Sequence, residues 1–132
     1  MRIFVDANVL FTAAYTPGGP SNLLVRFGHG RSLTLVTCDY VVGEVERNLA
    51  RKAPPAAMER LPALVAACEP VPTILNGDVP PGLPAKDHPI WLSAVAAGCN
   101  VLLTGDRKDF GRLKHPKMVV MGPSELFEEL WG

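Results

Sequence analysis

Four carboxylates in this sequence stand where they could hold a metal ion: Asp6, Glu44, Asp87 and Asp106. Asp6 directly follows the apolar run 3–5, and Asp106 closes the run 101–105. Both runs are apolar without alternation, as expected of parallel strands that are covered on both faces. Ligands bind beyond the carboxyl ends of such strands. Acids at two strand ends, with two more on neighbouring helices, would repel one another without a cation. The pattern therefore predicts a divalent metal site with hydrolytic chemistry.

Asp6 and Glu44 also have ordinary structural explanations. Asn8 could cap the helix that follows the first strand, but a cap at Asn8 would leave Asp6 without a partner at the strand end. Glu44 lies on the flank of the apolar stripe of its helix, where it could simply pair with Arg47 or Asn48. Near the mouth of the sheet, the same glutamate could instead bind a metal ion or a water molecule.

The later acids are equally open to two explanations. Asp87 stands at the start of a predicted helix, where an N-cap is worth about 1 kcal/mol. Asp106 could form a turn after its strand, and Asp109 could assist the site or cap the segment that follows it. A structural role does not exclude a functional one here, because helix ends and strand ends are where the crevice of such a sheet lies.

The rest of the chain alternates apolar strands with helices, which predicts one three-layer α/β/α domain, residues 1–132, with a mostly parallel sheet. We predict strands at 2–6, 33–37, 101–104 and 118–121, with a further possible strand at 71–75. Helices are predicted at 40–52, capped by Thr37 or Asp39, at 56–68, at 88–98 and at 123–130, with one more that starts at Ser21 as N-cap and ends at Gly28 or Gly30.

Two prolines qualify these predictions. Pro62 lies inside the segment 56–68 and predicts either two short helices or one kinked helix. Pro72 confines a strand at 71–75 to the edge of the sheet, because proline cannot donate to a neighbouring strand.

Charge is balanced over the 132 residues, with 13 basic and 13 acidic side chains, so no global field attracts a polyanion. Five basic residues nevertheless follow Asp106 closely: Arg107, Lys108, Arg112, Lys114 and Lys117. This run could be a solvated loop or a patch that steers phosphates. We take Arg107, Lys108 and Arg112 as candidate RNA contacts.

Three cysteines, Cys38, Cys68 and Cys99, are far apart and embedded in apolar sequence, which favours buried thiols in a reducing compartment. The N-terminus enters a strand at once and leaves no room for a signal peptide, and no apolar run approaches the length of a membrane span. We therefore expect a cytoplasmic protein. No glycine-rich phosphate loop, dinucleotide fingerprint or serine-hydrolase elbow is present.

Several short motifs together resemble the PIN-domain family, whose members are metal-dependent ribonucleases and include the VapC-type toxins of bacterial toxin–antitoxin pairs. The resemblance runs through nearly the whole chain. It rests on Val5-Asp6-Ala7-Asn8-Val9-Leu10, on the segment 87–110 with Thr104-Gly105-Asp106 and Asp109-Phe110, on the break 18–20 and on the ending 123–127.

The resemblance implies a parallel sheet of strand order 3-2-1-4-5, with the segment 71–75 at an edge. It maps Asp6, Glu44, Asp87 and Asp106 onto the four acidic positions of the family, the last of which varies between the positions of Asp106 and Asp109. Glu44 is matched through its helix alone. Asn8 and Thr104, beside these acids, are secondary candidates.

The expected chemistry is hydrolysis of RNA phosphodiester bonds with Mg²⁺ or Mn²⁺, because carboxylates and water suit these hard ions. Asp6 would be the central ligand, Asp87 and Asp106 would complete the metal site, and Glu44 would orient or deprotonate the attacking water. The family resemblance implies products with a 5′-phosphate and a 3′-hydroxyl, a homodimer and a small antitoxin partner. Exposed apolar residues that such an interface could cover are Phe11, Tyr15 and Trp131.

Two other functions remain open from the sequence. The chain could be a PIN-like module that binds RNA or a protein without turnover. It could also be a phosphatase or phosphoacceptor domain that uses an aspartate, although the run 6–8 lacks the second aspartate of such phosphatases and no suitable lysine follows the run 118–121.

Overall fold

Five parallel strands form one sheet in the order β3-β2-β1-β4-β5, which confirms the expected order 3-2-1-4-5. The structure is a computed structural model that describes residues 1–132. The strands are β1 (Arg2–Val5), β2 (Thr34–Thr37), β3 (Glu69–Pro70), β4 (Val101–Leu103) and β5 (Val119–Met121). In the central strand, Phe4 lies opposite Val36 of β2 and Leu102 of β4.

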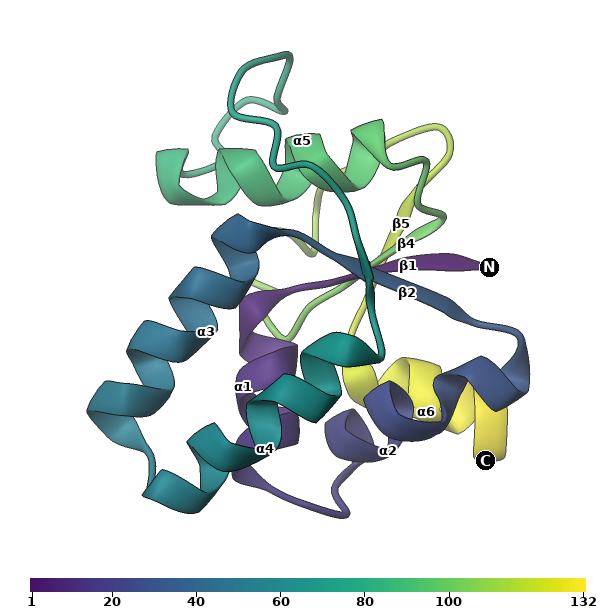
Figure 1. The fold of residues 1–132 in the computed structure, drawn as a ribbon. Helices are drawn as coiled ribbons and strands as arrows, with labels where there is room; N and C mark the ends of the chain where they lie inside the picture. The colour runs from purple at the N-terminus through teal and green to yellow at the C-terminus, as the bar shows by residue number, and fades with distance from the viewer.

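Helices cover both faces of this sheet. They are α1 (Ala7–Tyr15), α2 (Pro20–Phe27), α3 (Asp39–Lys52), α4 (Pro55–Ala66), α5 (His88–Ala96) and α6 (Pro123–Trp131), with short 3₁₀ turns η1 (Gly28–Arg31) and η2 (Ala85–Asp87). Figure 1 shows α5 on one face of the sheet and α1, α2, α4 and α6 on the other. The α/β/α arrangement predicted from the alternation of strands and helices is therefore present. No helix combines the length and the apolar composition needed to span a bilayer.

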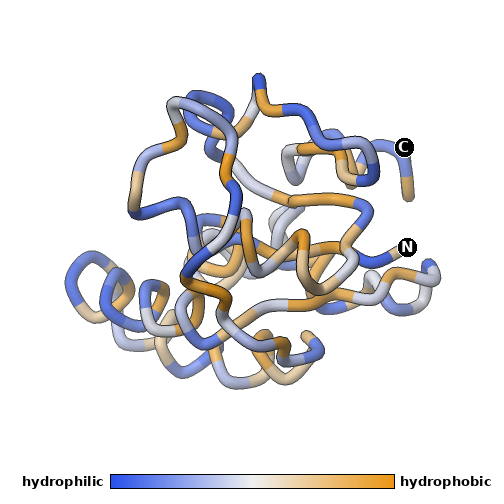
Figure 2. The backbone as a smooth tube through the Cα atoms, turned by 90° about the horizontal axis from the view of Figure 1, so that it is seen from above, coloured by the Kyte–Doolittle hydropathy of each residue, from blue (hydrophilic) through white to orange (hydrophobic).

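The hydrophobic core lies on both sides of β1. Ile3, Phe4 and Val5 have no exposed surface, so the continuous apolar run reflects a strand buried on both faces. Figure 2 shows hydrophobic residues concentrated in the segments that cross the middle of the molecule. Because β1 is buried on both faces, its packing fixes the position of Asp6, the residue that directly follows the strand.

The helix caps differ from those predicted. Asp6, and not Asn8, caps α1, because its Oδ1 accepts the N–H of Ala7 at 2.6 Å. Ser21 is not a cap either: Gly19 is the N-cap of α2, with Pro20 as the first helical residue. Proline is favoured at that position because its missing N–H would have had no partner.

The cap of α3 comes from a distant residue. The helix starts at Asp39 with Cys38 as its N-cap, and neither Thr37 nor Asp39 supplies a capping side chain. Instead, Oγ1 of Thr73 accepts the N–H of Tyr40 at 3.2 Å. This contact spans 33 residues of sequence, so no local pattern could have indicated it.

The edge strand is β3 at Glu69–Pro70, and the predicted strand at 71–75 was wrong. Val71 still donates its N–H to Thr37 O at 2.9 Å, but Pro72 cannot continue the ladder. The chain then turns toward the helices, where Ile74 N–H donates to Oγ of Ser93 at 2.8 Å. The segment 71–75 thus joins α3 and α5 to the sheet edge, through the side chain of Thr73 and the backbone of Val71 and Ile74.

Pro62 lies within one helix, α4, and not between two short ones. Leu61 and Leu64 are buried, so tertiary packing holds the helix together across the proline. Pro62 itself is exposed and has no N–H to donate to the carbonyl of Met58.

We predict that Pro62→Ala stabilises the protein by about 1–2 kcal/mol, because the gain in helix propensity exceeds the entropy that proline removes from the unfolded chain. Urea denaturation measures the change. Pro55→Ala is the matched control at the first position of α4, where proline interrupts no hydrogen bond, and should change stability by less than about 0.5 kcal/mol. A loss of stability in Pro62→Ala would contradict this account of α4.

Candidate metal centre

Three carboxylates converge beyond the carboxyl end of the sheet. Asp87, Asp106 and Asp109 each place one oxygen within 4.8 Å of the others, and we call them the carboxylate cluster. Asp87 lies where η2 meets α5, and the other two belong to the loop after β4. Asp87 is buried, whereas Asp106 and Asp109 are half-buried. The cluster is therefore reachable from solvent on the side of the β4 loop.

The loop that carries Asp106 and Asp109 is held by its own hydrogen bonds. Oδ1 of Asp106 accepts the N–H of Asp109 at 3.0 Å, and the carbonyl of Asp106 accepts the N–H of Phe110 at 3.2 Å. Phe110 has no exposed surface and anchors the turn in the core. Asp106 thus forms the turn that was one of the two roles expected from the sequence. Its carboxylate also belongs to the cluster.

Asp6 is not one of the three clustered acids but is joined to Asp106 through Thr104. Thr104 donates its hydroxyl proton to Oδ2 of Asp6 at 2.7 Å, and the same hydroxyl oxygen accepts the N–H of Asp106 at 2.9 Å. Asn8 donates to Oδ2 of Asp6 at 3.2 Å, and its own Oδ1 accepts the N–H of Gly105 at 2.7 Å. Asn8 and Thr104 therefore connect the ends of β1 and β4.

The carboxyl group of Asp6 has a raised pKa, and burial is the main cause. The residue is 3% exposed, and desolvation raises the pKa of its carboxyl to about 6, although the bonds from Thr104 and Ala7 act to lower it. The negative charges of Glu44 and Asp87 raise this pKa further. A carboxylate that is desolvated and repelled by two other acids favours either a proton or a cation beside it.

Lys86 supplies the positive charge that the cluster has in this structure. Its Nζ donates to both carboxylate oxygens of Asp87 at 3.2 Å and lies 3.5 Å from Oδ2 of Asp109. Burial raises the pKa of Asp87, which Lys86 lowers and Asp109 raises further. Burial also acts to raise the pKa of Asp109, but its hydrogen bonds and Lys86 outweigh this effect, so the net pKa is lowered. The pKa values of the two acids are therefore shifted in opposite directions.

Asp87 occupies the N-cap position of α5, yet its side chain makes no capping bond. The capping explanation is therefore wrong, because the carboxylate turns to Lys86 instead of the helix N–H groups. Lys86 was not singled out in the sequence, although its position next to the candidate ligand Asp87 was the one available signal.

Glu44 is half-buried on α3, where it makes no hydrogen bond or ion pair with Arg47 or Asn48. The simple pairing explanation is thus wrong. Its charge acts on Asp6 and also raises the pKa of Tyr40, after the larger effect of burial. Tyr40 was not singled out in the sequence, but its hydroxyl donates to the carbonyl of Lys86 at 2.6 Å and so positions the start of η2.

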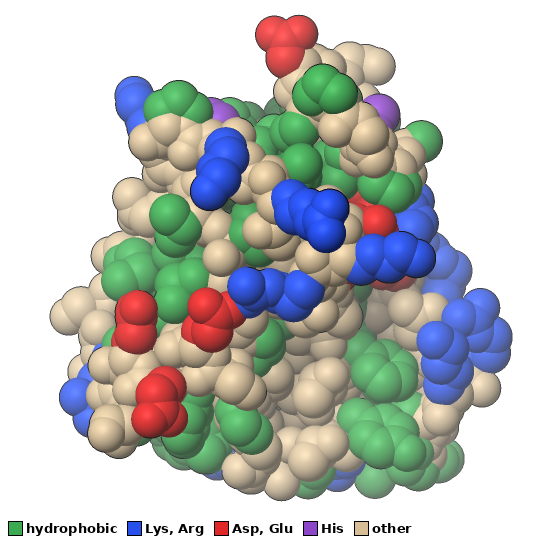
Figure 3. Space-filling view, turned by 180° about the vertical axis from the view of Figure 1, so that it is seen from behind, with side chains coloured by type: hydrophobic (Ala, Val, Ile, Leu, Met, Phe, Trp, Pro, Cys, Tyr) green, Lys and Arg blue, Asp and Glu red, His purple; other side chains and the backbone are tan.

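The basic run near the cluster is exposed. Lys108 and Arg112 make no ion pair, whereas Arg107 pairs with Glu125 at the first turn of α6. Figure 3 shows Lys and Arg side chains gathered over one face of the molecule, with a small area of acidic atoms between them. The same view shows further acidic side chains grouped below and to the left of these basic ones.

The donor set fits a hard divalent cation. All three clustered donors are carboxylate oxygens, no histidine or cysteine belongs to the group, and a lysine ammonium already bridges two of the acids. Such oxygen donors suit Mg²⁺ and Mn²⁺ better than softer metals.

Comparisons with known proteins bear on the fold. The sequence matches no family model and no curated protein. Among solved structures, the chain is similar to a chain in the crystal structure of VapBC2 from Rickettsia felis bound to a DNA fragment from the promoter. The two share 14% sequence identity with a TM-score of 0.64, over 92% of this chain and 98% of the other. The chain has a PIN-like fold. A PIN-like fold is what the short motifs of the sequence had implied.

Asp6 should make the stability of the metal-free protein depend on pH. Its pKa is about 6 when folded, against about 3.9 in an unfolded chain, so the folded state binds more protons between these values. Stability from this group is complete below about pH 4 and is lost as pH rises through about 6.

Asp6→Asn removes this loss. We expect its free energy of unfolding, relative to wild type, to rise by on the order of 2 kcal/mol from pH 4 to pH 6.5 in EDTA, measured by urea denaturation. Parallel pH profiles for the two proteins would contradict the raised pKa of Asp6.

Removal of Lys86 should favour a divalent cation. We expect Lys86→Gln to lower the melting temperature in EDTA and to tighten Mn²⁺ binding about two- to fivefold, because the ammonium no longer competes for the acids. Isothermal titration calorimetry measures the affinity. Lys108→Gln removes the same charge from an exposed residue without an ion pair and serves as control. Equal Mn²⁺ affinity in both variants would show that Lys86 does not compete for this site.

Proposed function

We propose that this protein is a ribonuclease that requires Mg²⁺ or Mn²⁺ and acts as the toxin of a toxin–antitoxin pair. The observation that supports the proposal most is the convergence of Asp87, Asp106 and Asp109, with the buried Asp6 linked to them through Thr104. Oxygen donors in this number, at the edge of a PIN-like sheet, are suited to hydrolysis of a phosphodiester.

The proposed ligands are Asp6, Asp87 and Asp106, with Asp109 close enough to replace or join Asp106. Glu44 is proposed to bind the same cation, because its negative charge already raises the pKa of Asp6. When bound, Mg²⁺ or Mn²⁺ would lower the pKa of water and offset charge on the phosphate oxygens.

The side chains of the protein would divide the remaining work. Glu44 carries no competing ion pair, so it is free to orient the attacking water and accept its proton. Thr104 and Asn8 hold the carboxylate of Asp6 in one orientation. Water would attack phosphorus and lose one proton to Glu44, and the bond from phosphorus to the 3′-oxygen would break. The 3′-oxygen would take up a proton from solvent to become a 3′-hydroxyl, and the other product would carry a 5′-phosphate.

The basic residues that follow Asp106 in the chain are proposed to bind the RNA strand. Lys108 and Arg112 are exposed and unpaired, so they can contact phosphates without first breaking an ion pair. Arg107 would have to exchange Glu125 for a phosphate. Such contacts would make RNA binding sensitive to salt.

A protein partner is proposed by analogy with the structural neighbour, which is a VapBC2 assembly. We propose a small antitoxin as that partner and a homodimer as the assembly of this chain. Phe11 stacks on the half-exposed Tyr15, with ring centroids 5.8 Å apart, and Trp131 packs on Phe127 at the end of α6. These aromatic pairs are candidates for interface residues. Three free, buried cysteines agree with the cytoplasm as the proposed location.

An aspartate that accepts phosphate is disfavoured by the state of Asp6. Asp6 is 3% exposed and each of its oxygens accepts a hydrogen bond, so a phosphorus atom has no open approach to either oxygen. Oδ1, which accepts only the N–H of Ala7, still has a second lone pair, with which it can bind a cation. A module that binds RNA without turnover is distinguished by a single-turnover assay.

Purified protein with Mn²⁺ should cleave single-stranded RNA to products with a 5′-phosphate, measured on labelled oligonucleotides under single-turnover conditions. We expect Asp6→Asn and Asp106→Asn each to lower the rate about 100-fold or more, because each removes charge that binds the cation. Asp6→Asn should also relieve any toxicity on expression.

Asp78→Asn is the control, since it removes an exposed acid that lies outside the cluster. Its rate should equal that of wild type. RNA bound by wild type but not cleaved in a single turnover would favour the binding module. Cleavage at equal rates by wild type and Asp6→Asn would reject the proposed active site.

A further inference from the structure

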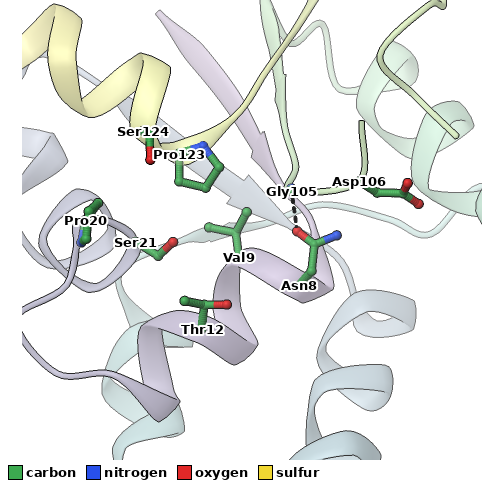
Figure 4. Close-up of a pocket in the computed structure, with 9 residues that line it drawn as sticks. All are labelled: Asn8, Val9, Thr12, Pro20, Ser21, Gly105, Asp106, Pro123 and Ser124. Atoms are coloured by element: carbon green, nitrogen blue, oxygen red, sulfur yellow. Dashed lines mark hydrogen bonds between the residues drawn. The ribbon is translucent and has the colours of Figure 1, made fainter. Parts of the chain in front are cut away.

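A hollow adjoins the carboxylate cluster and shares Asp106 with it. Its volume is about 510 Å³, and its polar lining comes from Asn8, Thr12, Ser21, Gly105, Asp106 and Ser124. Figure 4 shows the carboxylate of Asp106 directed away from the space between Ser21 and Ser124. Asp106 is the one charged residue of this lining, so the rest of the hollow consists of neutral hydrogen-bonding groups.

Two helices begin at this hollow. α2 starts with Pro20 and α6 with Pro123, and both prolines line it. The first backbone bonds into these helices are Leu23 N–H to Gly19 O and Leu126 N–H to Gly122 O. The N–H groups of Ser21 and Asn22 in α2, and of Ser124 in α6, therefore donate to no backbone carbonyl, whereas Glu125 takes part in the capping box of α6 with Gly122. Helix N-termini of this kind attract anions.

Ser21 gives an independent indication of a ligand. The residue is 4% exposed, and its hydroxyl has no hydrogen-bond partner in the protein although it lines the hollow. Figure 4 shows this hydroxyl directed into the hollow, with Ser124 on the facing helix end. No side-chain oxygen or nitrogen that is fully enclosed lacks a partner, so the hydroxyl of Ser21 keeps its contact with solvent through the hollow, where a ligand can accept its proton.

A basic side chain, that of Arg107, lies near one of the two helix ends. Arg107 pairs with Glu125 in the first turn of α6 and lies close to Gly122, the N-cap of that helix. Arg107 is exposed, so a change of rotamer can turn its guanidinium from Glu125 to an anion at the helix end. The hollow thus combines free N–H groups, a free hydroxyl and an arginine, which together match a phosphate.

We propose that this hollow binds a backbone phosphate of the RNA strand, at a linkage neighbouring the one held by the carboxylate cluster. The inference rests on the proposed function for the identity of the strand. Asp106 lies between the two sites, so a strand that places one phosphate at the acids leads directly into the hollow. The hollow would position the strand by its backbone and would not distinguish bases.

Ser124→Asp tests this subsite. Ser124 is exposed at the second position of α6, where an acid favours the helix but repels a phosphate. Ala56→Asp is the matched control, because Ala56 is exposed at the second position of α4, also follows a proline, and does not line the hollow. Both variants should fold with a melting temperature at or above that of wild type.

The affinity for a fluorescent 2′-O-methyl RNA oligonucleotide is measured by anisotropy with Ca²⁺. We expect Ser124→Asp to bind about tenfold more weakly than Ala56→Asp. Ser21→Ala, which removes the free hydroxyl and adds no charge, should weaken binding by a smaller factor. A single methylphosphonate, placed at successive linkages of the oligonucleotide, should abolish the effect of Ser124→Asp at one linkage, because no charge then remains to be repelled.

Inorganic phosphate, added to metal-free protein, provides a readout that does not depend on RNA. The amide NMR signals of Ser21, Asn22, Ser124 and Glu125 should shift in wild type and not in Ser124→Asp. If these signals shift while Ser124→Asp and Ala56→Asp bind RNA equally, the hollow binds an adventitious ion only and the proposal is overturned. RNA cleavage without either effect would also overturn it and leave the ribonuclease proposal intact. Both effects without cleavage would support the subsite and count against the ribonuclease.

Discussion

Burial of a carboxylate among other carboxylates is the constraint on which the rest of this structure depends. Asp6 ends the central strand, has almost no exposed surface, and is repelled by Glu44 and Asp87. A buried charge needs hydrogen bonds or a counter-charge. Thr104 and Asn8 provide hydrogen bonds, and in doing so they fix the end of β4 against the end of β1. The hydroxyl of Thr104, which stabilises the buried Asp6, also accepts the N–H of Asp106 and so holds the two residues near each other.

Positively charged groups lie close to these acids. Lys86 contacts Asp87 and Asp109 directly. Arg107, in the loop after β4, pairs with Glu125 of α6. Two helix N-termini, at Pro20 and Pro123, add partial positive charge on the other side of Asp106. Acids that favour a cation therefore lie next to groups that favour an anion. A cation bound to a phosphodiester satisfies both at once, which is why phosphate hydrolysis fits this edge of the sheet.

The sequence predicted those parts of the structure that depend on local patterns. The continuous apolar runs around Phe4 and Leu102 indicated buried parallel strands, and the strand order followed from the PIN-like motifs. The sequence could not predict features set by distant partners. Thr73 caps α3 across 33 residues, and Ser93 receives the chain after Pro72, so the segment 71–75 left the sheet. That Asp109 lies near Asp87 could be seen only in the folded structure. The position of Asp106 at the end of β4 followed from the apolar run that precedes it in the sequence. Lys86 was overlooked because an exposed lysine beside an acid is common in any sequence.

The central claim, that these acids hold a divalent cation, is tested most directly by anomalous diffraction from a crystal soaked in Mn²⁺. The account predicts an anomalous peak at about 2.1 Å from carboxylate oxygens of Asp6, of Asp87 and of Asp106, Asp109 or both, with Nζ of Lys86 moved away from the acids. A soaked crystal without a peak between these residues, and with Lys86 still bridging Asp87 and Asp109, would contradict it.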